Sequence, residues 1–260
     1  MNELLVARFG GASVDELGGG HQSRVFRVDL PSGVTMVAKV LDAAAVDHGE
    51  LQERVEVVAA LADLEPLVCR PLPIDRRLVT ELTDDFYVVC YEHADGAPPD
   101  PSDATDAAMM GRTLSRLHHS MAQLPPTRLP VVAALRAARS DTSEPRQLHG
   151  VVRAFDLDDC GYGPPAFDVA NAVYMVLFDA IVHDAGDTYR AFRESFVSAY
   201  SDAARHVVDD DVIDRFIDVR VDALRGWLED PAHAPTGIST ASPTWRATLR
   251  SFVTTYWSSR

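Results

Sequence analysis

The chain has 260 residues, of which 47% are hydrophobic and 24% are charged, and this composition is typical of a globular protein with a sizeable core. A formal net charge of −15 disfavours a nucleic-acid backbone or an anionic membrane as partner. The N-terminus lacks a signal-peptide pattern, and no apolar run reaches the roughly 18 residues of a membrane span. Three cysteines without a CxxC pair indicate neither a zinc site nor a disulfide framework, so we expect a cytoplasmic protein.

The first 92 residues predict a small, mostly β-stranded lobe with one helix. Three glycines at 18–20 form a turn before the first strand. Apolar residues recur every three or four positions over 50–64 and predict a helix there. Alternating and β-branched residues predict the strands, which we place at 25–28, 34–40, 78–82 and 86–91.

Residues 93–101 (HADGAPPDP) are typical of a linker, and beyond them the pattern becomes helical. Ser242 and Pro243 predict a helix start, because serine is a good N-cap and proline fits the first helical position. The remaining helices are predicted at 104–121, 173–204 and 212–228. The fold class is therefore α+β with two lobes, an N-terminal lobe at 1–92 and a helical lobe at 102–260. A cleft between two lobes is a natural ligand site.

Lys39 is the only lysine among the 24 cationic residues, the others being arginine. An ammonium is a compact point charge and a guanidinium is a planar fork, so the two are not interchangeable. A single exception can also arise by chance. We nevertheless expect Lys39 to have a role that an arginine cannot fill.

Lys39, the glycine turn and the acidic helix together favour a phosphate site. Backbone N–H groups of Gly18, Gly19 and Gly20 and a point cation can hold phosphates, and a glutamate on the helix can hold the lysine. Taken alone, the three glycines fit an ordinary hairpin turn equally well. Glu53 and Glu56 are three residues apart and share a helix face, and we prefer Glu56 as the partner of Lys39.

The most specific motif is FDLDDCGYGPPAFDVA at 155–170, which follows the tripeptide LHG at 148–150. Together with VAK at 37–39 and LSRLH at 114–118, it resembles the aminoglycoside phosphotransferase family, whose fold is similar to that of protein kinases. The resemblance extends over most of the chain. It implies a small-molecule kinase with a small antiparallel-sheet N-lobe and a larger helical C-lobe. It also implies ATP (or GTP) and Mg²⁺ as cofactors and a small-molecule hydroxyl as acceptor.

The resemblance further implies roles for individual residues. Lys39 would bind the α- and β-phosphates. Asp156, assisted by Asp158, would bind Mg²⁺, for which carboxylate oxygens are suitable ligands. His149 matches the histidine of the family's catalytic loop. Asp168 would be structural and would accept backbone hydrogen bonds beneath that loop. Backbone groups of the hinge would contact adenine, and the hinge residues would be Tyr91, Glu92 and His93.

The family pattern is interrupted where the catalytic aspartate should stand. That position, directly after Gly150, is Val151, and no asparagine follows at the required spacing. The aspartate would orient and deprotonate the acceptor hydroxyl, and the asparagine would hold a metal ion. Five residues separate Gly150 from Asp156. That is roughly nine fewer than a catalytic loop and a minimal hairpin need.

Two explanations of this gap are open. If a disordered loop is missing from the sequence as written, the chain should break between Gly150 and Val151, with a second break between Met121 and Arg146. If the protein has truly lost the loop, it is a pseudokinase, a nucleotide-binding regulatory module without turnover. We prefer the first explanation and expect a phosphotransferase. Its acceptor cannot be read from the sequence, since relatives act on aminoglycosides, homoserine, choline-like alcohols and sugars. The oligomeric state is equally unreadable.

Overall fold

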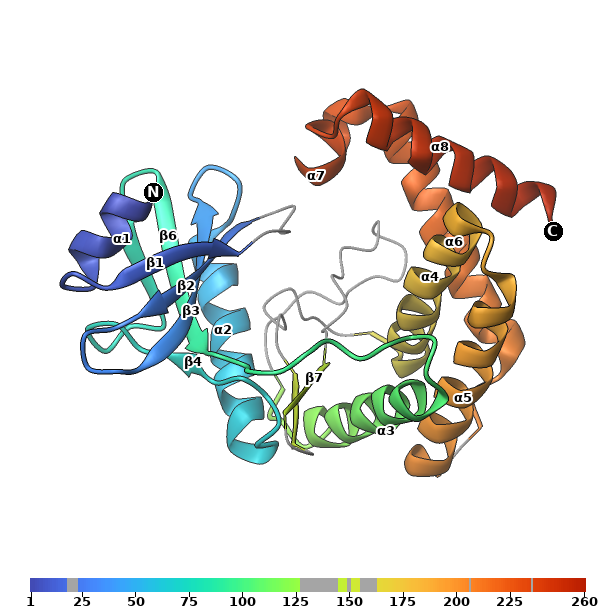
Figure 1. Ribbon diagram of the computed structural model, residues 1–260, viewed down its shortest axis with the longest axis horizontal. Helices are drawn as coiled ribbons and strands as arrows, with labels where there is room; N and C mark the ends of the chain where they lie inside the picture. Colours follow the sequence, from blue (N-terminus) through green and yellow to red (C-terminus); the bar gives the residue numbers. More distant parts are fainter. Residues whose placement is uncertain (18–22, 127–144, 149–150, 155–162, 206, 235) are drawn as a thin grey trace.

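The structure is a computed structural model, and it describes all residues except 18–22, 127–144, 149–150, 155–162, 206 and 235. Figure 1 shows a lobe built on a sheet and a lobe built of helices, joined by an extended segment. This arrangement confirms the predicted two-lobed α+β class. The last strand of the first lobe ends at Glu92, and the first helix of the second lobe begins at Ala104.

The N-terminal lobe is built on a six-stranded sheet whose paired strands all run antiparallel. Two helices accompany it, α1 (Asn2–Arg8) and α2 (His48–Leu64). In spatial order the strands are β1 (Ser13–Leu17), β2 (Ser23–Asp29), β3 (Thr35–Asp42), β6 (Phe86–Glu92) and β4 (Pro71–Leu72), with β5 (Val79–Thr83) also paired to β6.

Alternation along β3 divides the lobe into two apolar clusters. Met36, Ala38 and Val40 are buried together with Leu5 of α1. Leu41 is buried with residues of α2 on the other face. Because successive side chains of a strand point to opposite faces, Lys39 lies on the same face as Leu41, the face that α2 covers.

Three short elements of this lobe were not predicted: α1, β1 and β4. The helix α1 has seven residues and buries only Leu5. Most of β1 is exposed at the edge of the sheet, and β4 has two residues. Elements this short carry too few apolar positions to show a period. The predicted strands and the helix at 50–64 agree with the structure to within about two residues.

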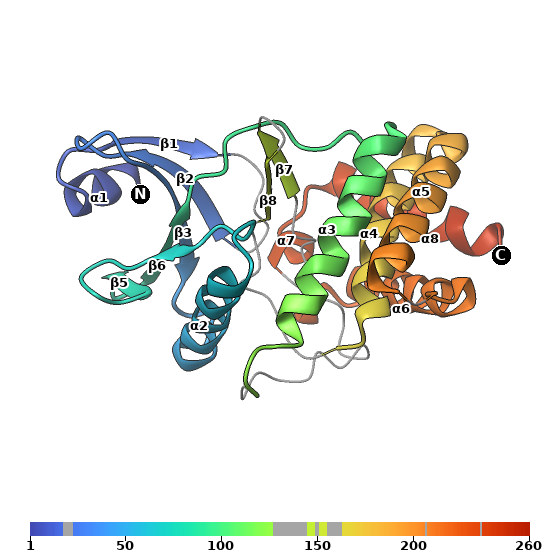
Figure 2. The same ribbon diagram turned by 90° about the horizontal axis from the view of Figure 1, so that it is seen from below.

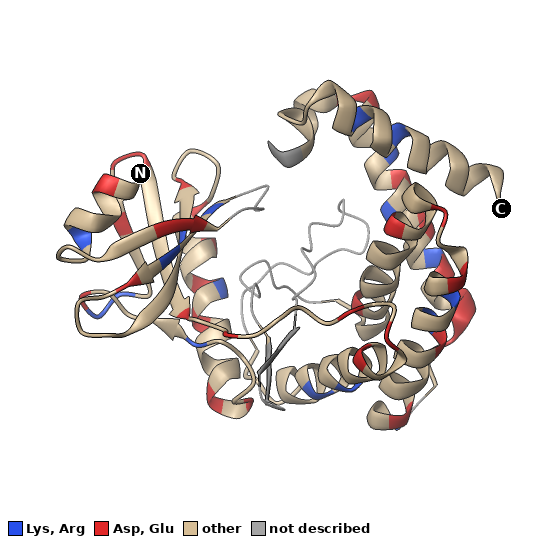
Figure 3. Ribbon diagram, in the orientation of Figure 1, with Lys and Arg blue, Asp and Glu red and all other residues tan. Residues whose placement is uncertain are grey.

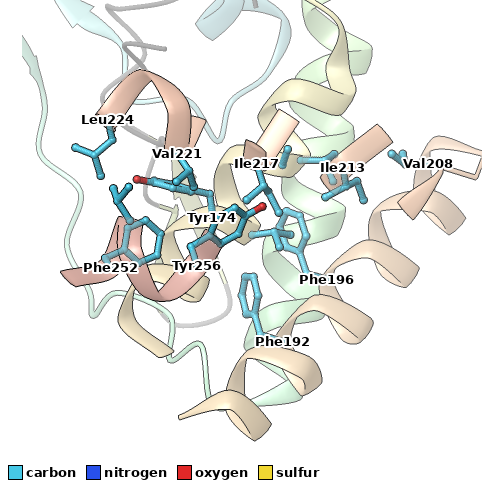
Figure 4. Packing of buried hydrophobic residues seen from close by; sticks show 14 of the residues in the cluster. Tyr174, Phe192, Phe196, Val208, Ile213, Ile217, Val221, Leu224, Phe252 and Tyr256 are labelled. Atoms are coloured by element: carbon cyan, nitrogen blue, oxygen red, sulfur yellow. The ribbon is translucent and has the colours of Figure 1, made fainter. Parts of the chain in front are cut away.

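The C-terminal lobe is mainly helical and packs around one apolar core. Figure 4 shows the aromatic and aliphatic side chains that meet there, among them Tyr174, Phe196 and Phe252. Ser242 caps the last helix as predicted, since its hydroxyl accepts from the Trp245 N–H at 3.1 Å. The helices are α3 (Ala104–Met121), α4 (Pro165–His183), α5 (Gly186–Ala204), α6 (Asp210–Glu229), α7 (Thr236–Ser239) and α8 (Pro243–Ser258), with a 3₁₀ turn at Pro231–His233.

The single helix predicted at 173–204 is wrong, because the chain forms two helices there. Asp184 ends α4 in the left-handed conformation, with φ of 54°. Aspartate adopts this conformation more readily than most residues do, so it can end a helix. The apolar period of the sequence continues past this position, and the period alone therefore does not reveal that the helix ends there. By length and composition α4 could span a membrane. In this structure it belongs to the core, where Phe167, Val169 and Val173 are buried.

Two further strands, β7 (Pro145–Leu148) and β8 (Val151–Ala154), pair antiparallel with Leu148 opposite Val151. Figure 2 shows this pair between the N-terminal sheet and α3. The predicted break at Gly150 lies outside the described residues, as does most of the segment predicted to hold the second break.

Candidate active site

Lys39 lies in the middle of the sheet, between Val25 of β2 and Val89 of β6. It is 9% exposed, although lysine is almost never buried without a compensating partner. Burying an ammonium is costly unless anionic or polar groups surround it. The side chain is enclosed on the face of the sheet that α2 covers.

The two candidate glutamates of α2 differ in exposure. Glu56 is exposed, and its carboxylate accepts from the Gln52 amide at 2.7 Å. Glu53 is half-buried. The helix is fixed at its start by Asp47, which accepts from the Glu50 N–H at 2.8 Å. The prediction that Glu56 pairs with Lys39 is not tested by these contacts, and Glu53 is the less exposed of the two candidates.

The glycine turn at 18–20 lies outside the described residues, but the strands on either side of it are described. Leu17 at the end of β1 pairs with Val25 of β2. Figure 1 shows that β1 ends and β2 begins on the side of the sheet that faces the C-terminal lobe. The glycine turn therefore connects two strand ends that face the C-terminal lobe.

The predicted hinge residues stand at the end of β6. Tyr91 is 7% exposed. The Glu92 N–H donates to the Arg70 carbonyl at 2.9 Å, and the Glu92 carboxylate accepts from the Arg70 N–H at 3.3 Å. His93 Nδ1 lies 2.9 Å from an Asp95 carboxylate oxygen. Because Arg70 already occupies the Glu92 N–H, a base bound here would have to use other backbone groups of the hinge.

The predicted metal ligands Asp156 and Asp158 and the loop residue His149 lie outside the described residues. Within the described part of the chain, no group of three or more His, Cys, Asp or Glu side chains is placed to hold a metal ion.

Asp168, at the start of α4, is held by a side-chain chain that links three helices. Its carboxylate lies 2.9 Å from His118 Nε2, and His118 Nδ1 lies 2.9 Å from the Tyr200 hydroxyl. Burial, together with the negative charge of Asp168, raises the pKa of Tyr200 to about 12. The tyrosine hydroxyl therefore keeps its proton in the neutral range, and because a carboxylate only accepts hydrogen bonds, the Nε2–H of His118 donates to Asp168.

The resemblance implied that Asp168 accepts backbone hydrogen bonds, whereas the partner found for its carboxylate among the described residues is the His118 side chain. The LSRLH motif contains His118, but no role was predicted for this histidine, and nothing in the sequence indicated Tyr200. The only signal for such a role was a polar residue, His118, among the apolar residues of the helix predicted at 104–121.

Charge is distributed broadly over the molecule. Figure 3 shows acidic residues on both lobes and along the segment that joins them, in line with the net charge of −15. Arginine side chains neutralise part of this negative charge in the helical lobe, where Arg193 forms ion pairs with both Asp210 and Asp214.

Comparison with known proteins supports this fold. No protein-family model and no curated protein matches the chain by sequence. Among solved structures, amicoumacin kinase in complex with AMP-PNP and Ca²⁺ is 17% identical, with a TM-score of 0.71 over 93% of this chain and 86% of that one.

Two further structures are similar at lower identity. A microcompartment-associated aminopropanol kinase is 16% identical, with a TM-score of 0.67 over 99% of this chain and 97% of that one. An aminoglycoside phosphotransferase in ternary complex with ADP and hygromycin B is 13% identical, with a TM-score of 0.56 over 97% of both chains. The chain therefore has the two-lobed, kinase-like fold of aminoglycoside phosphotransferases and related small-molecule kinases.

Proposed function

We propose that the protein is an ATP- and Mg²⁺-dependent phosphotransferase that moves the γ-phosphoryl group to a hydroxyl of a small molecule. The observation that carries this proposal is Lys39. It is the only lysine of the chain, it is 9% exposed, and it lies on the α2 face of the sheet in a fold shared with small-molecule kinases.

In this proposal the chain acts by positioning and charge stabilisation. The Lys39 ammonium holds the phosphates, and Glu53 of α2 keeps the ammonium in place. Asp156 and Asp158 would hold Mg²⁺, which when bound offsets phosphate charge. The hinge at Tyr91 and the residues after it would receive the base.

The structural neighbours support a small-molecule acceptor. Their names describe an aminopropanol kinase and enzymes bound to antibiotics. We propose an amino-alcohol or aminoglycoside-like acceptor, and a cytoplasmic enzyme that needs neither nucleic acid nor a membrane.

One observation favours a second candidate, a nucleotide-binding module without phosphotransfer. β7 and β8 are separated by two residues, the length of the shortest hairpin connection. A catalytic aspartate, four residues and an asparagine do not fit between them. If the chain is complete as written, this candidate applies.

An ATP-consumption assay distinguishes the two candidate functions. The protein is incubated with ATP and Mg²⁺ against a panel of amino-alcohols, aminoglycosides and sugars, and ADP release is measured. We expect acceptor-dependent release that Lys39→Arg removes, while Arg8→Lys leaves it unchanged, since Arg8 pairs with exposed Asp75 at the surface. No release with any acceptor, together with retained nucleotide binding, would establish the second candidate.

A further inference from the structure

The connection between α2 and β4 is hydrogen-bonded to the C-terminal lobe. The Ala154 N–H at the end of β8 donates to the Leu67 carbonyl, and the Cys69 N–H donates to the Ala154 carbonyl, both at 2.7 Å. Val68, between them, forms a parallel bridge to Ala154. We call Leu67, Val68, Cys69 and Ala154 the interlobe seam. Ala154 and Val68 are 1% and 2% exposed, so these bonds are shielded from water.

A buried carboxylate stands at one end of this seam. Glu65 ends α2 and is 5% exposed. Arg116 of α3 binds it with two donors, Nη2 at 2.6 Å and Nε at 3.3 Å, one to each carboxylate oxygen. The Leu67 N–H lies 3.4 Å from the same carboxylate. The ion pair and the seam are therefore connected through Leu67, whose carbonyl in turn accepts from Ala154.

The two partners are unequal in exposure. The Arg116 side chain is 61% exposed, so its charge is hydrated whether or not the pair forms. The Glu65 carboxylate is almost fully enclosed, and a buried charge without a partner is strongly unfavourable. Loss of the ion pair would therefore cost more free energy at Glu65 than at Arg116.

Apolar packing continues the same contact. Leu117, next to Arg116, is 2% exposed and belongs to the cluster that contains Leu61, Val68 and Leu41. That cluster joins α2 to strand β3, which carries Lys39. Figures 1 and 2 both show the end of α2 beside the end of α3.

We propose that the Glu65–Arg116 ion pair is an interlobe latch. It fixes the end of α2 on α3, and so it positions the glutamates of α2 against Lys39 when the lobes hold a nucleotide. Glu65 and Arg116 are positioning residues in this account. The nucleotide part rests on the proposed function, whereas the latch itself does not.

Amide hydrogen exchange tests the latch without any ligand. In Arg116→Ala we expect the amides of Cys69 and Ala154 to exchange about tenfold faster or more, because the unpaired carboxylate opens the seam to water. Amides of α8 should keep their rates. The matched control is Asp63→Ala, which removes an exposed carboxylate of the same helix that pairs with Arg70.

A second change distinguishes the latch from general damage. In the Arg116→Ala background, Glu65→Gln removes the buried charge that Arg116 had compensated, so the two seam amides should return toward their original rates. If Arg116→Ala fails to fold, Arg116→Lys should give a smaller acceleration of the same two amides. The latch is wrong if the seam amides in Arg116→Ala exchange no faster than in Asp63→Ala, or if amides of α8 accelerate equally.

Calorimetry with AMP-PNP and Mg²⁺ tests the positioning role. We expect affinity to fall about tenfold in Arg116→Ala and to recover when Glu65→Gln is added. An open seam with unchanged affinity would overturn the positioning role. Absence of binding by the unmodified protein would instead overturn the proposed function, and the exchange rates would still decide the latch.

Discussion

The thiol of Cys90 is completely enclosed in the sheet, at 0% exposure. Burial raises its pKa from an ordinary 9.0 to about 12. Above pH 9 the unfolded chain therefore loses the thiol proton while the folded chain keeps it. Stability from this group is complete below pH 9 and is lost as pH rises from 9 toward 12, at up to about 1.4 kcal/mol per pH unit.

Urea unfolding at pH 8, 9, 10 and 11 measures this loss. Cys90→Ala should show a shallower fall of unfolding free energy between pH 9 and 11 than the unmodified protein. Tyr174, Tyr200 and Tyr256 are shifted in the same direction, so the difference between the two proteins is the relevant quantity. Parallel curves for the two proteins would show that Cys90 ionises equally in both states.

At the residue scale, the sequence predicted what local chemistry determines. The only lysine of the chain indicated a position with a special role, and it lies enclosed in the sheet. Ser242 before a proline predicted the helix cap that the structure shows. The choice between Glu53 and Glu56 was different. It depends on how α2 is rotated against the sheet, and the sequence leaves it open because residues three apart share one helix face.

At the scale of elements, the contact between α3 and α5 depends on Gly111. A Cβ at this position would lie 2.3 Å from the Phe196 carbonyl oxygen and 3.0 Å from the Tyr200 N. Both are backbone atoms of α5, so no side-chain rotation relieves the clash. We expect Gly111→Ala to lower the free energy of unfolding by about 2–3 kcal/mol or more, because the helices must move apart.

Gly226→Ala is the matched control, since a Cβ there meets nothing within 4 Å and the residue is exposed in α6. It should raise stability by about 0.5–1 kcal/mol, as alanine favours helix over glycine. Urea unfolding of both variants decides the matter. A Gly111→Ala protein as stable as the unmodified one would show that α3 and α5 pack less closely than described.

Long periodic elements were predictable and their interruptions were not. The bounds of α3 agree with the prediction at both ends, because Asp103 caps it and a clear apolar stripe fills it. The break at Asp184 left no mark in the apolar pattern. The short edge strand β1 was missed because its exposed residues show neither burial nor a turn signal of their own.

At the scale of the whole molecule, the two-lobed fold followed from the change of pattern after residue 92 and from the motif at 155–170. The side-chain contacts that hold the helices and lobes together could not be predicted in the same way. Glu65 and Arg116 are 51 residues apart, and His118 and Asp168 are 50 residues apart. Such pairs have no local period, so only the folded chain brings them together.

The proposed function requires that the protein binds a nucleotide together with a divalent metal, with Lys39 holding the phosphates. Calorimetric titration of Mg²⁺ and AMP-PNP into the unmodified protein and into Lys39→Arg tests it most directly. The account predicts metal-dependent binding to the unmodified protein and a loss of at least about tenfold in affinity in the variant, because a planar guanidinium does not replace a buried point charge. Equal affinity in both proteins, or no binding to the unmodified protein, would contradict it.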